Sequence, residues 1–202
     1  MEDATVRTMI AALFLVGPIV VVPLGLWLVP DPAGGRSQVL LHAARWLSLP
    51  VGAALAVAFA LLPGMVAGLL AVPWLGMAIL AALAALLDTL AAAQDGRLTR
   101  LGAHHGNWAA LAFLAVAAGN ALADRSGIQP FGFAPVIILM TAVHFTFAGF
   151  ALVLVGTHAH ASGPGRATAA AGSSSLSISE TQPTSWPSDP GRGTSARATH
   201  GS

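Results

Sequence analysis

The sequence predicts an all-α membrane protein, a polytopic bundle of about five transmembrane helices followed by a disordered C-terminal tail. Of the 202 residues, 55% are hydrophobic and only 8% are charged, and the mean hydropathy is +0.75. A water-soluble surface needs more charge than this. The absence of cysteine excludes a disulfide scaffold, a cysteine-ligated metal site and a thiol nucleophile. The nine cationic residues, all arginine, are too scattered for a nucleic-acid-binding surface.

Charged residues mark where a span cannot lie, because an ionised side chain costs several kcal/mol at the centre of a bilayer. They leave four uncharged runs that reach or exceed the roughly 20 residues needed to cross the hydrocarbon core. The runs are 8–30, 46–87, 101–123 and 126–165.

The first two runs predict three helices. The first run predicts a helix over about 8–29, which is too long and too rich in proline for a cleaved signal peptide. The second run is too long for one helix and contains the turn pair Pro63-Gly64. It therefore predicts two helices, over about 47–62 and 66–88.

The last two runs predict one helix each. The third gives a helix over about 106–123, and the fourth begins with loop residues, which leaves a helix over about 133–157. Residues 1–160 are thus expected to form a five-helix transmembrane domain. Residues 161–202 are rich in Ser, Thr, Gly, Pro and Ala and predict a disordered tail, either a plain low-complexity extension or a partner-binding arm.

The arginines near the predicted helix ends indicate the orientation, since cytoplasmic loops carry an excess of positive charge. Five fall on one side and two on the other, which predicts a plasma-membrane protein with its N-terminus outside and its C-terminus in the cytoplasm. The larger group is Arg36, Arg45, Arg97, Arg100 and Arg166, and the smaller is Arg7 and Arg125.

His144 is the polar residue expected nearest to the membrane midplane, about 16 Å into the last helix. Its face also carries Thr141 and Ala148, small groups typical of a surface packed on protein, whereas Thr146 lies about 200° around, toward lipid. His144 is interpreted as a proton carrier or substrate ligand, or as a neutral histidine bonded to a neighbouring helix. The candidate binding residues here are His144, Thr141, Phe147 and Ala148.

Two polar residues near the cytoplasmic rim complete the candidate binding site. Asp88 closes the third predicted helix and Asn107 opens the fourth. Asp88 is interpreted most simply as a helix end that meets water, and alternatively as a carboxylate in an ion pathway.

Five further histidines gather at the same rim. A zinc site there is less favoured than a set of interfacial rings, and His144 lies roughly 20 Å too deep to join it. We therefore expect no metal and no cofactor. These residues are His42, His104, His105, His158 and His160.

Prolines recur inside the predicted spans. Broken helices build the polar sites of many transporters, although proline is also commoner in membrane helices in general. These prolines are Pro18, Pro23, Pro50, Pro73 and Pro135.

The run T-A-V-H-F-T-F-A-G-F over residues 141–150 resembles the signature of the YndJ-like family of bacterial membrane proteins, approximately T-A-V-H-F-H-Y-A-G-F. Residues 22–26, 62–64 and 71–75 extend the resemblance, which covers most of residues 10–157. It implies a polytopic membrane protein, sometimes labelled a transporter, without a defined substrate.

The chain departs from that signature at two positions. Thr146 stands in place of the second histidine and Phe147 in place of the tyrosine. The loss of the phenol beside His144 weakens the interpretation of this region as a reaction site.

The expected function is therefore transporter-like, with a mid-membrane polar site around His144 that a homodimer or a second membrane subunit completes. One alternative is an accessory or structural subunit. The other, less favoured, is a membrane-embedded enzyme that uses His144 as acid or base on a lipophilic substrate. Membrane lipids are expected partners and nucleic acid is not, and the small-molecule substrate stays unassigned. The lysine-free composition indicates a GC-rich bacterial genome.

Overall fold

The chain divides into two units, Met1–Gly163 and Pro164–Ser202. The predicted tail falls outside the described residues from 162 onward. This computed structural model describes residues 2–32, 34–96 and 102–161, with side chains for 8–32, 34–96 and 106–160.

Every regular element in the described part of the chain is a helix, which confirms the all-α class, and five helices are long and apolar enough to span a membrane. The first span runs through α1 (Glu2–Val16), the π-helix η1 (Gly17–Val21) and α2 (Val22–Leu28). The second and third are α3 (Gly35–Ala60) and α4 (Met65–Gln94), and the fourth is α5 (Gly102–Ser126). After the short 3-10 helix η3 (Pro130–Gly132), the fifth runs through α6 (Pro135–His144), the π-helix η4 (Phe145–Leu152) and α7 (Val153–Ala161).

In the structure the turn between α3 and α4 contains Pro63-Gly64, and both helices extend beyond the spans expected from the sequence. Helix α3 begins at Gly35 instead of near residue 47, and α4 continues to Gln94 instead of ending near residue 88. Charged residues were expected to mark helix ends, but α3 includes Arg36 and Arg45 and α4 includes Asp88. In α3 the charge of Arg45 is neutralised by partners on the first span, so it does not interrupt the helix.

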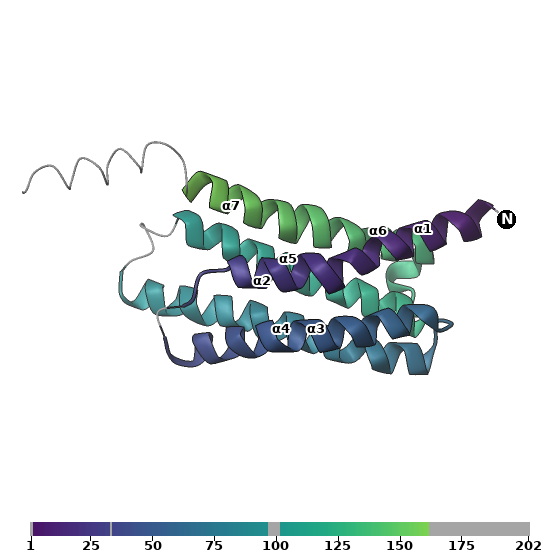
Figure 1. Ribbon diagram of the computed structural model, residues 1–202, viewed down its shortest axis with the longest axis horizontal. Helices are drawn as coiled ribbons and strands as arrows, with labels where there is room; N and C mark the ends of the chain where they lie inside the picture. The colour runs from purple at the N-terminus through teal and green to yellow at the C-terminus, as the bar shows by residue number, and fades with distance from the viewer. Residues whose placement is uncertain (1, 33, 97–101, 162–202) are drawn as a thin grey trace, which may run out of the picture. The chain divides into compact units, whose positions relative to one another are not determined.

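The five spans form a ring in which each contacts two neighbours. The first span packs on α3, α3 on α4, α4 on α5, and α5 on the fifth span, which returns to the first. Figure 1 shows α5 lying between the α3–α4 hairpin and the green fifth span. One end of the ring therefore joins the end of α2, the end of α4 and the start of α5.

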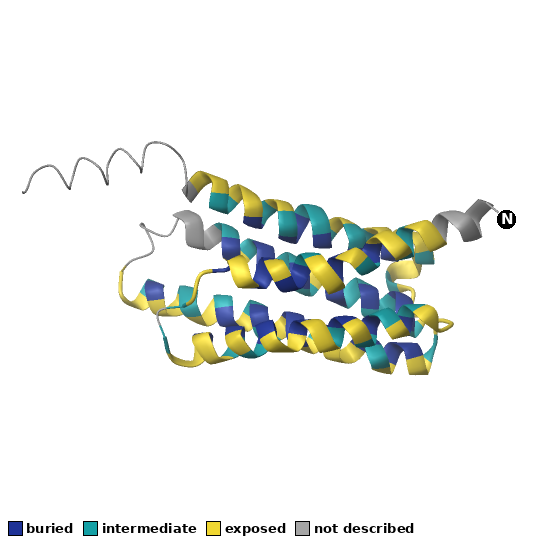
Figure 2. Ribbon diagram, in the orientation of Figure 1, coloured by how far each residue is buried: buried dark blue, intermediate teal, exposed yellow. Residues whose placement is uncertain are grey.

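Small residues face the interior of the bundle, and large apolar residues cover its outside. The buried positions include many alanines, while large side chains such as Trp46, Leu69 and Leu152 are exposed along the outward faces (Figure 2). Without a hydrophobic driving force between helices in lipid, close backbone approach is what favours their association. This pattern is that of a bundle surrounded by hydrocarbon.

Glycines set how closely the fifth span approaches its neighbours. A Cβ placed on Gly17 would lie 2.6 Å from Thr146 Cγ2, and one placed on Gly25 would lie 2.6 Å from the Phe150 ring. Gly149 lies equally close to Phe113 of α5. These contacts turn the face of Thr146, Gly149 and Phe150 into the bundle, where all three are buried.

Only one of the two π-helical segments contains an interior proline. Pro18 lies in η1, and its carbonyl oxygen would stand 2.7 Å from a Cβ on Gly52 of α3. A π-turn accommodates the carbonyl that a proline leaves without its donor. By contrast, Pro50 and Pro73 lie inside α3 and α4 without ending either helix.

The glycine contacts make a stability prediction. Replacing Gly149 with alanine places a methyl group 2.7 Å from Phe113 Cβ, an atom near the backbone that cannot swing away. We expect Gly149→Ala to lower the free energy of unfolding by about 1–3 kcal/mol, measured as a lower Tm in detergent.

Gly156→Ala is the matched control, because nothing lies within 4 Å of a Cβ at Gly156 in the same span. Alanine there should leave the stability unchanged or raise it by up to about 1 kcal/mol. Equal losses in the two variants would contradict close packing at Gly149.

Candidate functional site

The buried guanidinium of Arg45 fastens the end of the first span to α3. Its Nε donates to the carbonyl oxygen of Leu26 at 2.9 Å, and its Nη2 donates to that of Val29 at 2.5 Å. Its Nη1 donates to Asp31 Oδ1 at 2.5 Å, and the guanidinium lies 5.3 Å from the centre of the Trp27 ring. The last carbonyls of a helix lack backbone partners and carry partial negative charge, so a cation suits this place.

Next to this contact, Val29, Pro30 and Pro32 form one wall of a small cavity whose other walls come from α3, α4 and α5. Its volume is about 30 Å³. A water molecule needs roughly 10–15 Å³ by this measure, so one or two waters or one bare cation fit. The lining residues are Val29, Pro30, Pro32, Leu41, Ala84, Ala85, Asp88, Thr89, Asn107, Trp108 and Leu111. We call this cavity the Asp88 pocket.

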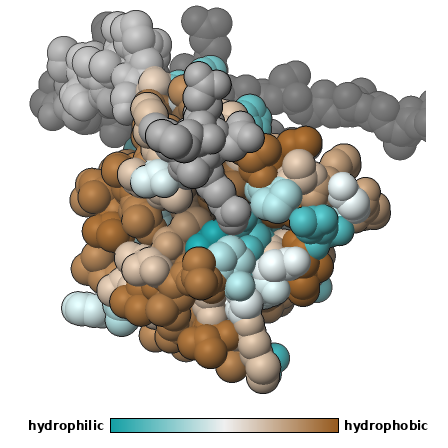
Figure 3. Space-filling model, turned by 90° about the vertical axis from the view of Figure 1, so that its right-hand side faces the viewer, coloured by the Kyte–Doolittle hydropathy of each residue, from teal (hydrophilic) through white to brown (hydrophobic). Residues whose placement is uncertain are grey.

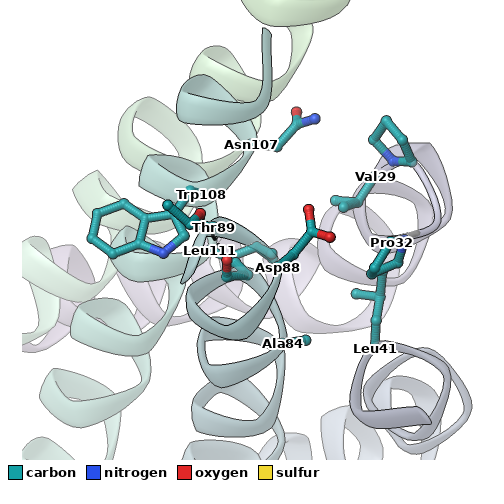
Figure 4. Close-up of a pocket in the computed structure, with 11 residues that line it drawn as sticks. Val29, Pro32, Leu41, Ala84, Asp88, Thr89, Asn107, Trp108 and Leu111 are labelled. Carbon is teal, nitrogen blue, oxygen red and sulfur yellow. Dashed lines mark hydrogen bonds between the residues drawn. The ribbon is translucent and has the colours of Figure 1, made fainter. Parts of the chain in front are cut away.

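Two oxygen-bearing side chains face the Asp88 pocket. Figure 4 shows the half-buried carboxylate of Asp88 turned toward Val29, the amide of Asn107 above it, and the Trp108 ring on the other side of the view. Asn107 is 7% exposed, and its Oδ1 is the one buried side-chain oxygen or nitrogen in the described residues without a hydrogen-bond partner. The Thr89 hydroxyl donates to the carbonyl of Ala85 at 2.9 Å, which leaves its own lone pairs available. The pocket therefore offers acceptors, and it suits a cation or a hydrogen-bond donor.

A second buried arginine closes the opposite end of the bundle. Arg125 donates through Nε at 2.8 Å and through Nη2 to the same carboxylate oxygen of its neighbour Asp124, and both residues are buried. Its guanidinium also lies 4.2 Å from the Phe59 ring, and its backbone carbonyl accepts from Gly64 N at 2.8 Å. Figure 3 looks onto this end, where hydrophilic surface lies in the middle of a hydrophobic border. These contacts hold the α3–α4 turn against α5.

The structure corrects the expected orientation of His144. Its side chain is exposed on the outside of the bundle, whereas Thr146, assigned to the lipid side, is buried and donates to Ala142 O at 2.8 Å. The two residues do lie on opposite sides of the helix, but the inward side is that of Thr146. The physical reason is the close approach of Gly17 to Thr146, which a longer side chain at position 17 would prevent.

Of the other residues expected around His144, only Thr141 lies in the same shallow outer hollow among the described residues, and its hydroxyl donates to Ile137 O at 2.8 Å. Phe147 and Ala148 are half-buried in η4, and Phe147 Cε2 would stand 3.9 Å from a Cβ on Gly17, toward the first span. Of the six candidate residues, the structure brings Asp88 and Asn107 together in one cavity, and Thr141 and His144 together in the outer hollow.

The rim histidines show no metal cluster where they are described. His42 and His160 are exposed, and a His158 ring nitrogen lies 3.3 Å from Leu154 O. The side chains of His104 and His105 fall outside the described residues. Among the residues that are described, no three metal-ligating side chains converge.

Sequence reasoning missed Arg45 and Thr89 as members of this region. From the sequence, Arg45 is expected only as a charge outside the predicted spans, and a threonine at a helix end, such as Thr89, gives no distinctive signal. One signal was available for Arg45, since Asp31 provides an opposite charge across the connection between the first two spans.

One comparison with known proteins gives a match. The sequence model of the family described as YndJ-like protein matches residues 12–179, more than half of the chain. The match continues past residue 157, where the resemblance was expected to end. Neither the curated proteins nor the solved structures contain a match.

The Arg45 contacts make a second stability prediction. A lysine ammonium cannot reach three acceptors in the planar arrangement that a guanidinium offers. We expect Arg45→Lys to lower the free energy of unfolding by about 1.5–3 kcal/mol, measured by thermal or denaturant unfolding.

Arg36→Lys is the control, because Arg36 is an exposed residue in the first turn of the same helix. It should change stability by less than about 0.5 kcal/mol. An Arg45→Lys protein as stable as the Arg36→Lys protein would show that the three contacts contribute nothing specific to arginine.

Proposed function

The chain belongs to the YndJ-like family, and from this premise we propose that it is a transporter-like membrane protein that binds a small cation in the Asp88 pocket. The observation that carries the proposal is Asn107 Oδ1, a buried acceptor without a partner among the described residues, in a cavity shared with a carboxylate. Five apolar helices agree with a multi-pass membrane protein.

The chemistry of the pocket favours a cation over an anion or an apolar molecule. A buried acceptor that lacks a partner costs about 1–3 kcal/mol, which a coordinating cation or a donating ligand offsets. The Asp88 carboxylate adds negative charge, and the oxygen donors of Asp, Asn and Thr suit hard cations. A volume of about 30 Å³ has room for one cation or one or two waters.

The wall that can open the pocket is the segment 29–32. It follows the last turn of α2, has no regular helical structure, and contains Pro30 and Pro32. Arg45 holds its carbonyls and Asp31 from one side. Release of these contacts would expose Asp88 to the solution at this end, and their formation would enclose a bound ion.

A second candidate function is that of an accessory or structural membrane subunit. It is supported by the outward position of His144, which suits an interface between proteins within the membrane better than contact with lipid. An enzymatic role gains no support, because the described residues place no second titratable side chain beside His144 in its hollow.

We also propose that the pocket faces the cytoplasm and that the protein lies in the plasma membrane. The connection from α2 to α3 and the end of α7 lie at the pocket end, where the excess of arginine was predicted. This orientation places the N-terminus outside.

The cation proposal predicts a salt-specific gain in stability. The Tm of the purified protein is measured in LiCl, NaCl or KCl against N-methyl-D-glucamine chloride at equal ionic strength. We expect one alkali cation to stabilise the wild type, by about 2.7 kcal/mol at 100 times its Kd. Asp88→Asn and Asn107→Leu should each abolish that increment, because each removes an oxygen ligand or its charge.

Asp95→Asn is the matched control, since Asp95 is exposed at the C-terminal end of the same helix α4. It should retain the full increment. A wild-type Tm that is the same in all four salts, and unchanged when MgCl2 or CaCl2 is added at equal ionic strength, would contradict cation binding. Flux of the stabilising ion into proteoliposomes, absent in Asp88→Asn, then distinguishes transport from binding alone.

The orientation predicts which end of the bundle a membrane-impermeant maleimide reaches. The chain has no cysteine, so single substitutions give clean reporters. In intact cells Gln129→Cys should be labelled, and Gln38→Cys, exposed at the pocket end, should be labelled only after permeabilisation. The reverse pattern would place the pocket outside.

A further inference from the structure

The fifth span has an outward face that carries His144 and takes no part in the Asp88 pocket. This face consists of Ile137, Met140, Thr141 and His144, and we call it the His144 face. Ile137 and Met140 are about half exposed, and His144 is exposed beside them. The face surrounds a shallow hollow on the outside of the bundle.

The imidazole of His144 lacks a hydrogen-bond partner among the described residues. Its one ring contact is the edge of Phe145, at 5.5 Å between centroids. Thr141 does not donate a hydrogen bond to His144, because its hydroxyl donates to Ile137 O. Lipid chains offer no hydrogen bonds, and an unpaired polar side chain in hydrocarbon is costly.

The position of His144 argues against headgroups as the missing partner. It is the tenth residue of a 26-residue candidate span, Pro135–His160. At 1.5 Å per residue it lies about 13 Å inside the nearer end of the helix. A partner at that depth must itself be a membrane-embedded group, which points to another protein surface.

We propose that the occupant of the His144 face is a second copy of this chain, packed about a twofold axis that passes close to His144. A neutral imidazole carries one N–H donor and one nitrogen acceptor, so one ring can donate to the acceptor nitrogen of a second copy. A twofold interface brings identical patches together and so places the two rings next to each other near the axis. The protruding Ile137 and Met140 and the neighbouring hollow give the face both the projections and the depression that self-packing uses.

The small size of Thr141 supports the same arrangement. Thr141 sits one turn before His144 and leaves room for a partner helix to approach, as small residues do at helix interfaces in membranes. The dimer would leave the Asp88 pocket untouched, since the pocket is lined by the α2–α3 connection, α4, α5 and Leu41 of α3, and by no residue of the fifth span. The two proposals therefore stand or fall separately.

Cysteine crosslinking in native membranes tests the interface. The full chain has no cysteine, so Met140→Cys reports on the His144 face and Val116→Cys, exposed on α5, is the matched control. Oxidation with copper phenanthroline should give a disulfide-linked dimer of the chain for Met140→Cys and none for Val116→Cys. Equal crosslinking of both variants, or crosslinking of Met140→Cys only to a different protein, would overturn the proposal.

Replacement of His144 tests its hydrogen bond. The dimer dissociation constant is measured by energy transfer between labelled copies in liposomes at increasing lipid dilution. We expect His144→Leu to weaken the dimer by about 3- to 30-fold, the range measured for interhelical hydrogen bonds in membranes. His144→Asn, which keeps a donor and an acceptor, should restore most of the affinity. A His144→Leu dimer as strong as the wild type would overturn the assignment.

Discussion

The structure of the polar end of the bundle depends on the charge of Arg45 being satisfied inside the protein. Its guanidinium contacts two carbonyls at the end of the first span and the carboxylate of Asp31. A buried guanidinium that loses its acceptors is costly, so these contacts tie α3 to the first span in one register. Residues 29–32 then lie across α4 and α5, and the cavity with Asp88 and Asn107 follows from that placement.

Glycine contacts impose the second constraint, at the middle of the bundle. Gly17 and Gly25 present bare backbone to the fifth span, and the fifth span presents Gly149 to α5. The fifth span is therefore packed closely against the first span on one side and against α5 on the other. Its remaining face, which carries His144, points out of the bundle. The exposure of His144 therefore follows from residues more than one hundred positions earlier in the chain, and not from the polarity of the imidazole.

These constraints explain which predictions held. The positions of charged residues and the lengths of the uncharged runs were enough to predict five spans and the turn at Pro63-Gly64. The bilayer limits the length and the charge of each span separately, so neighbouring helices need not be known. The prediction of which face of the fifth span points inward was wrong. It used only the polarity of residues in that helix, whereas Gly17 and Gly25, which determine the close packing, lie in the first span. Asp88 and Asn107 could be placed near one rim from helix lengths, but their shared cavity needs the wall at residues 29–32, whose position depends on Arg45.

The departures from the family signature gain a structural meaning from this geometry. Position 146, where the signature carries a second histidine, is the buried position opposite Gly17, and here it holds a threonine whose hydroxyl is bonded to its own helix. The histidine that the chain retains, His144, faces outward. A family member with an imidazole at position 146 would carry a polar group between the first and fifth spans, at mid-bundle. In this chain that place is apolar except for one satisfied hydroxyl, and the acceptors able to bind a ligand lie at the Asp88 end instead.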